Sequence, residues 1–165
     1  MPKVIIFSTT YPAHHPLAGS PTYFVDQFLN SLNRWPQVEN KTVINADLIS
    51  NIYCGNTLHN KHHTIRQGQR FKVGEFFSPR IWSGKPYASK QITICTPVRI
   101  EQIYNILFDD FDFYINDKLC EYTTFLRLVS NDGFLPQTEP LQAFKDWFPL
   151  RFSGQIICWN KNIKY

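Results

Sequence analysis

Apolar and polar positions alternate along several short stretches of the chain, a pattern that predicts strands more often than helices. The apolar run from Val4 to Phe7 is typical of a buried strand, and 75–82 and 89–96 alternate in the β manner on either side of the turn sequence WSGKPY. A further strand is expected at the end of 101–113 and a closing strand at 152–159.

Two stretches have the helical period instead. The first runs to about Asn33, with Ser20 as its N-cap, Pro21 as its first position and one apolar face made by Phe24, Val25, Phe28, Leu29 and Leu32. The second begins at a Thr138 cap and stops at Pro149, and its face is made by Leu141, Phe144, Lys145 and Phe148. Short strands that outnumber the helices predict a mainly β, α+β fold: a small, partly open β-barrel with two packed helices, rather than an alternating βαβ sheet.

The composition is that of one soluble domain spanning 1–165, because 165 residues with 43% hydrophobic and 18% charged content can bury a core of their own. Residues 34–58 give no clear pattern beyond a short strand at Thr42–Ile44. No apolar segment approaches the length of a membrane span, and the Val4–Phe7 run is too short for a signal peptide. Four cysteines without a C-x-x-C pair indicate free thiols, which favours the cytoplasm.

Charge is unevenly distributed. Between positions 61 and 90 there are seven cations and one acid, whereas between 101 and 150 there are nine acids and three cations. The basic segment indicates an anionic partner, although the two segments could also pair with each other across the fold. The 14 Phe, 8 Tyr and 4 Trp indicate a β-rich core, or in part a platform on which bases stack.

Five histidines in two clusters raise the question of a metal site: His14 and His15, then His59, His62 and His63. The second cluster lies among Lys and Arg residues with no nearby cysteine or carboxylate in sequence, and cations repel a divalent metal. We therefore expect no metal and no other cofactor.

The segment from Lys61 to Gly74 carries a short motif. Lys61-x-x-Thr64-x-Arg66, followed by Phe71-Lys72-Val73-Gly74, resembles the G-x-K-x-x-T-x-R…K-x-G-D signature of the ASCH domains, which are compact β-barrels of the PUA-like superfamily. The order of the surrounding elements is also similar: a first helix ending at Phe28-Leu29, Asn131-Asp132-Gly133 before a helix that ends at Trp147-Phe148-Pro149, and a last strand over 155–159. The chain departs from the family by an insertion at about 34–58, a longer middle around WSGKPY and the His-His pair.

The resemblance implies chemistry as well as fold. In the bacterial acetylcytidine amidohydrolases of this family, the lysine is the proton acceptor, the threonine the nucleophile and a glutamate before the late helix the proton donor. These roles fall on Lys61, Thr64 and, one methylene shorter, Asp132. The assignment is chemically coherent, because a threonine hydroxyl needs a base, and a neighbouring cation such as Arg66 lowers the pKa of a lysine. Lys61 and Arg66 could equally contact phosphates, Thr64 could be an ordinary strand residue, and Asp132 could simply begin an Asp-Gly turn.

The same segment also suits binding alone, since PUA-like barrels commonly hold RNA or a modified base in the cleft where this motif lies. Cations would contact phosphates, and an unstacked base could rest against an aromatic ring. The residues expected to bind are His63, Arg66, Arg70, Lys72, Arg80, Trp82 and Tyr87. We therefore expect a protein that binds RNA, a nucleotide or a modified nucleoside, with an amidohydrolase acting on acylated nucleosides such as acetylcytidine as the alternative. A protein-interaction module built on 34–58 is the third possibility, and nothing in the pattern predicts an oligomeric state.

Overall fold

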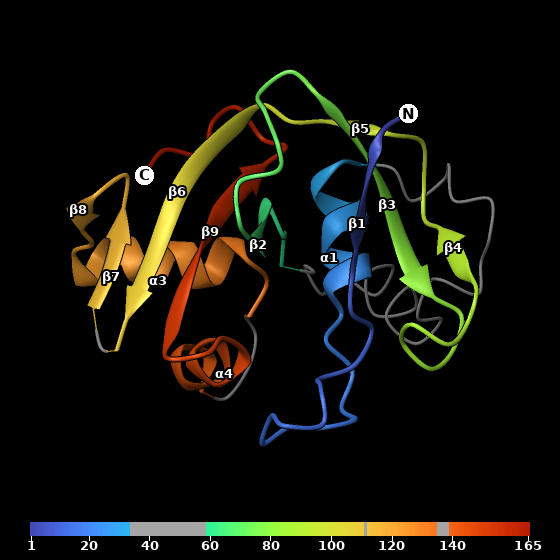
Figure 1. Cartoon of the computed structure of the whole chain (residues 1–165), viewed down its shortest axis with the longest axis horizontal. Coiled ribbons are helices and arrows are strands. Elements are labelled where there is room, and N and C mark those ends of the chain that lie inside the picture. Colours follow the sequence, from blue (N-terminus) through green and yellow to red (C-terminus); the bar gives the residue numbers. More distant parts are fainter. Residues whose placement is uncertain (34–58, 111, 135–138) are drawn as a thin grey trace.

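The computed structural model describes residues 1–33, 59–110, 112–134 and 139–165, which form two β-sheets and the helices packed on them (Figure 1). The mainly β, α+β class predicted from the sequence is confirmed. The described strands do not close into a barrel, because each sheet keeps its own edges. Three predicted features lie outside the described residues: the insertion at 34–58, the strand at Thr42–Ile44 and the Thr138 cap.

The first sheet is organised around β3 (Phe76–Trp82). The N-terminal strand β1 (Lys3–Ile6) runs parallel to β3. Gly74, at φ 86°, turns the chain just before β3 begins. Two short antiparallel strands pair with opposite ends of β3: β4 (Gln91–Thr93) near its end and β5 (Val98–Arg99) at its start.

The second sheet is antiparallel throughout, in the order β2-β9-β6-β7-β8. The strand β9 (Arg151–Cys158), which lies between β2 and β6, is buried without interruption from Gly154 onward, as expected for a strand covered on both faces. The other strands are β2 (His63–Gln67), β6 (Gln102–Asp109), β7 (Asp112–Ile115) and β8 (Lys118–Leu119).

The helices are α1 (Phe24–Ser31), α3 (Tyr122–Asn131) and α4 (Pro140–Trp147). Figure 1 shows α1 beside the first sheet, and α3 and α4 on the side of the second. The predicted Ser20 cap is wrong, because α1 begins later, after Tyr23 in the left-handed region, and Thr22 Oγ1 accepts from the Phe24 N–H at 3.4 Å. The prediction of two helices is also wrong. α3 was missed although its buried Phe125, Leu128 and Val129 have helical spacing.

Aromatic rings join these layers. Trp159 packs against Phe7, Phe28 and Phe77, and so links β1, α1 and β3 to the end of β9. A second group fills the space between β6, β7, α3 and α4: Phe108, Phe113, Phe125 and Phe144. The high aromatic content therefore goes largely into the core. Within the described ranges no helix is long and apolar enough to cross a membrane.

Candidate active site

Lys61 is placed in the interior by the two backbone bonds that hold its segment. The Lys61 N–H donates to the Gln27 carbonyl of α1 at 3.2 Å, and the His62 N–H donates to the Asn131 carbonyl at the end of α3 at 2.8 Å. The segment therefore runs between two helices just before β2 starts. Only 2% of Lys61 is exposed, which is rare for a lysine and requires a partner for its charge.

That partner is Asp132, the C-cap of α3, whose Oδ1 lies 2.6 Å from Lys61 Nζ. The ammonium also donates to the Asp132 backbone carbonyl and lies 4.3 Å from the centre of the Phe24 ring. Gly133, at φ 89°, turns the chain immediately afterwards. Asp132 thus begins a turn and also faces the lysine, so its two interpretations from the sequence are compatible.

Burial moves the two pKa values toward each other. It lowers the pKa of Lys61 to about 8, against the opposing effect of the Asp132 charge and hydrogen bond, and the Arg66 charge lowers it further. Burial also raises the pKa of Asp132, although Lys61 and Arg66 oppose this. Burial therefore brings the ionic and the neutral forms of this lysine–aspartate pair closer in energy than they are in water.

Thr64 and Arg66 are two residues apart in β2, so their side chains lie on one face of the strand. Both line a small cavity together with Lys61 and Asp132. Its volume is about 20 Å³, enough for one water-sized group. Arg66 is anchored there by an Nη2 bond to the Ile6 carbonyl of β1, which ties the second sheet to the first.

The cavity has apolar walls that sequence reasoning assigned to the core or did not single out. They are made by Phe7, Phe24, Ile65, Phe134, Trp147 and Phe148, with Ser8 at their side. These residues come from five separate parts of the chain. No local motif could have indicated these residues, whereas the Lys-x-x-Thr-x-Arg spacing did indicate Lys61, Thr64 and Arg66.

His63 is fully buried behind Asp132 and does not line the cavity. Its Nδ1 lies 3.6 Å from Asp132 Oδ1, and its ring packs edge-on against Tyr165. Neither ring nitrogen has a hydrogen-bond partner of good geometry among the described residues, although the Leu128 carbonyl favours its charged form. Burial holds the pKa of His63 well below its usual range, and the Lys61 charge lowers it further, so the ring is neutral.

The other residues predicted to bind lie outside the cavity. Arg70 and Tyr87 are exposed and near enough to Arg66 to act on its pKa, which Arg70 lowers and Tyr87 raises. Tyr87 also contacts the Trp82 ring at 5.5 Å between centroids. Lys72 is exposed beside Glu75, to which its N–H donates, and Arg80 bonds to Ser78 and Gln91.

The histidine clusters have structural partners. His15 Nε2 lies 2.8 Å from the Ala143 carbonyl, and His59 Nε2 lies 2.9 Å from the Ser130 carbonyl. Across the residues that the structure describes, no group of three His, Cys, Asp or Glu side chains could hold a metal ion.

Comparison of the chain with protein-family models, with curated proteins and with solved structures gave no significant match. The resemblance to the ASCH domains therefore remains a hypothesis based on the motif.

Proposed function

We propose that the protein is an amidohydrolase that removes a small acyl group from the amine of a modified nucleoside such as acetylcytidine, and that its two sheets are an open variant of the PUA-like ASCH fold. One observation carries the proposal: the buried Lys61–Asp132 pair lies at the same small cavity as Thr64 and Arg66. A buried pair with strongly perturbed pKa values is a common feature of catalytic sites, although purely structural ion pairs also have it.

The pair supplies both a base and an acid. When the proton passes from Lys61 Nζ to the Asp132 carboxylate, it leaves a neutral amine and a carboxylic acid without changing the total charge. The amine is then able to take the Thr64 proton, and the acid is able to protonate a leaving amine. Because the transfer leaves the total charge unchanged, the neutral form competes with the ionic form at every pH at which the pair keeps its proton, and the lowered pKa of Lys61 and the raised pKa of Asp132 both favour it.

The reaction proceeds in two balanced steps. In the first step, Thr64 Oγ1 forms a bond to the acyl carbon while the Lys61 amine takes the hydroxyl proton of Thr64. The C–N bond then breaks as the Asp132 carboxylic acid gives its proton to the leaving nitrogen. Water next attacks the threonine ester: Asp132 takes a proton from the water, Lys61 returns its proton to Thr64, and the free acid leaves. The Arg66 guanidinium, at the same cavity, would stabilise the negative charge that develops on the carbonyl oxygen.

The size of the cavity limits the acyl group. About 20 Å³ holds one water-sized group, so only the carbonyl end of a small acyl group would enter, and the rest of the substrate would stay at the mouth. Arg70 and Tyr87 are exposed and lie near enough to Arg66 to act on its pKa. We therefore expect them to contact a phosphate or a base of the substrate outside the cavity.

The experiment is to incubate the purified protein with formyl, acetyl and benzoyl derivatives of cytidine and to measure the acid released. We expect turnover of the two smaller substrates only. Lys61→Arg should abolish it, because an arginine stays protonated and cannot take the threonine proton, whereas the matched surface change Lys72→Arg should not. No release from any of the substrates, or full activity of Lys61→Arg, would contradict the proposal.

Binding of RNA without catalysis is the second candidate, and the exposed Arg70 and Lys72 close to the motif favour it. If it is correct, affinity for single-stranded RNA falls steeply with salt, because each neutralised phosphate releases counterions. Arg70→Ala and Lys72→Ala should then each weaken binding and flatten the salt dependence, and Lys118→Ala, on β8, serves as the control. Affinity that does not change with salt would exclude this function.

A further inference from the structure

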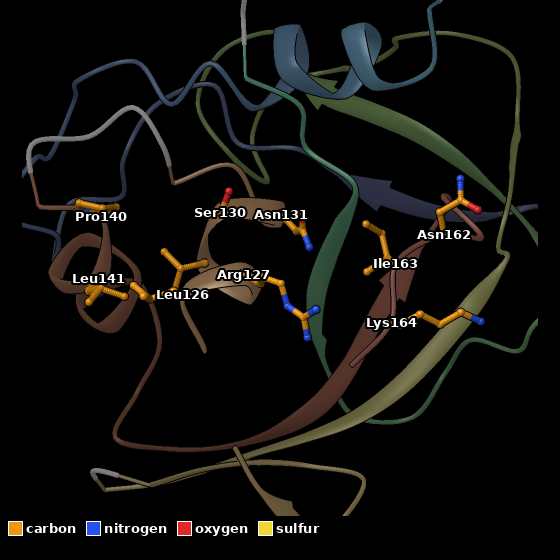
Figure 2. A pocket seen from close by; sticks show the side chains of 10 residues that line it. Leu126, Arg127, Ser130, Asn131, Pro140, Leu141, Asn162, Ile163 and Lys164 are labelled. Carbon is orange, nitrogen blue, oxygen red and sulfur yellow. The ribbon is translucent and has the colours of Figure 1, made fainter. Parts of the chain in front are cut away.

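A second and much larger cavity, of about 510 Å³, lies between α3, the start of α4 and the C-terminal tail (Figure 2). In the described parts of the chain it shares no lining residue with the candidate active site. Its volume is in the range of ordinary small-molecule sites, roughly 300–1,000 Å³. The sequence motif does not account for it.

The charge of this cavity has one sign. Arg127 of α3 and Lys164 of the tail are among its lining residues, and none of the described residues that line it is acidic. Neither cation has a carboxylate within 4.0 Å in the described ranges. Figure 2 shows the Arg127 side chain extending from α3 toward the tail, whereas the Lys164 side chain points away from Arg127. The guanidinium is therefore available for an anion, and its fork geometry suits a carboxylate or a phosphate.

The rest of the wall is mainly aliphatic. It is made by Leu126, Val129, Pro140, Leu141 and Ile163, and in the part of the chain that the structure describes no aromatic side chain lines the cavity. Two polar lining residues are already engaged: Asn131 Nδ2 donates to the Tyr165 hydroxyl at 2.9 Å, and the Ser130 hydroxyl lies 3.0 Å from His59 Nε2. A wall without aromatic rings offers no stacking surface for a nucleobase, so it suits an aliphatic body better.

We propose that this cavity is a binding site for a small organic anion, with a carboxylate or phosphate head paired to Arg127 and an aliphatic body packed against Leu126, Leu141 and Ile163. The site is separate from the proposed amidohydrolase cavity. Two properties of the cavity define the ligand class together: charge complementarity selects the head, and the aliphatic wall selects the body.

The test is calorimetric titration of the whole protein with octanoate, octyl phosphate, octanol and inorganic phosphate. Octanoate and octyl phosphate are kept below their micellar concentrations, and octanol below its solubility. We expect octanoate or octyl phosphate to bind, and the tighter of the two identifies the preferred head. Octanol lacks the charge and phosphate lacks the body, so each should bind at least about tenfold more weakly. Equal binding of octanol, or no binding of either amphiphile at millimolar concentration, would overturn the proposal.

Two variants locate the binding. Arg127→Gln should weaken it by about tenfold to a hundredfold, the value of a hydrogen bond to a charged group, and Arg99→Gln on β5 should leave it unchanged. Ile163→Asp, which puts a like charge beside the anion, should abolish it, and circular dichroism checks that this variant is folded. Thr64→Val should bind octanoate as the wild type does, which separates this site from catalysis. An Arg127→Gln protein with unchanged affinity would refute the site.

Discussion

The buried pair makes a pH-dependent prediction for the variant Asp132→Asn. In the wild type, the Asp132 charge and hydrogen bond raise the pKa of Lys61 and so oppose the effect of burial, which leaves this pKa at about 8. The variant removes both and leaves burial and Arg66, which each lower that pKa. Lys61 in the folded variant should therefore be neutral at pH values at which the wild-type lysine still holds its proton.

The magnitude follows from proton linkage. A proton held by the folded wild type but not by the folded variant stabilises the wild type, relative to the variant, by about 1.4 kcal/mol for each pH unit below the wild-type pKa. The difference in the free energy of unfolding between wild type and variant should thus shrink from pH 6 to pH 8, by up to about 3 kcal/mol when the variant lysine is neutral over that whole range, and should change little above pH 8. The sign is fixed, because the unfolded chains both hold the Lys61 proton throughout this range. Any proton that Asp132 takes up at lower pH adds in the same direction.

Urea-induced unfolding of both proteins at pH 6, 7, 8 and 9 measures this difference. The control is Asp109→Asn, which removes one of the two surface carboxylates paired with Arg151; the Asp109 side chain is 60% and the arginine 79% exposed. Its cost should stay below about 1 kcal/mol and vary little with pH. The double variant Lys61→Met, Asp132→Leu should recover most of the lost stability, since well-packed apolar residues often replace a buried pair without cost. A wild-type advantage that is constant from pH 6 to pH 9 would show that the lysine does not lose its proton in the variant.

Three further predictions follow from the same site. The kcat/KM for acetylcytidine should fall above about pH 8, because the Lys61–Asp132 pair then holds no proton for the leaving amine; a rate that keeps rising would mean that Asp132 is not the acid. Thr64→Ser should keep part of the activity and Thr64→Val none in the same acid-release assay, since only serine retains the hydroxyl; an active valine variant would exclude Thr64 as nucleophile. Gly154→Ala should lower the free energy of unfolding by at least about 2 kcal/mol in urea titrations, because the added Cβ would lie 2.2 Å from a backbone carbonyl oxygen of β2. Gly84→Ala, whose nearest contact would be 3.6 Å, should cost far less, and equal costs would contradict the reasoning.

Much of the site could be read from local spacing. Lys61, Thr64 and Arg66 lie within six positions, and the period of a strand places the last two on one face whatever the rest of the fold does. The resemblance to the ASCH motif added Asp132, which is 71 residues away from Lys61 and which spacing alone could not bring near it. The structure places these two side chains in contact.

Features that depend on long-range packing were not predictable. The cavity is closed by aromatic rings from four parts of the chain, so its small volume depends on tertiary packing and on no single motif. β1 lies at an edge of the first sheet and runs parallel to β3, a pairing that the apolar run at Val4–Phe7 does not reveal. The helix α3 was overlooked because Tyr122, Thr123 and Thr124 at its start favour strands, although packing of its apolar face overrides that preference.

The position of β2 at the edge of its sheet has a consequence for the order of folding. Within the described sheet its only neighbour is β9, in a register that pairs Thr64 with Ile157. The segment between β2 and β9 in the chain contains β3 to β8, α3 and α4, so pairing these two strands closes a long loop. Closing such a loop is slow, because the chain loses conformational entropy before it makes the contacts that compensate for the loss. Because β2 also precedes β9 in the chain, it leaves the ribosome well before β9 during synthesis. We therefore expect the cavity, which Thr64 and Arg66 of β2 line, to be completed late in folding, once β9 holds β2 in its register.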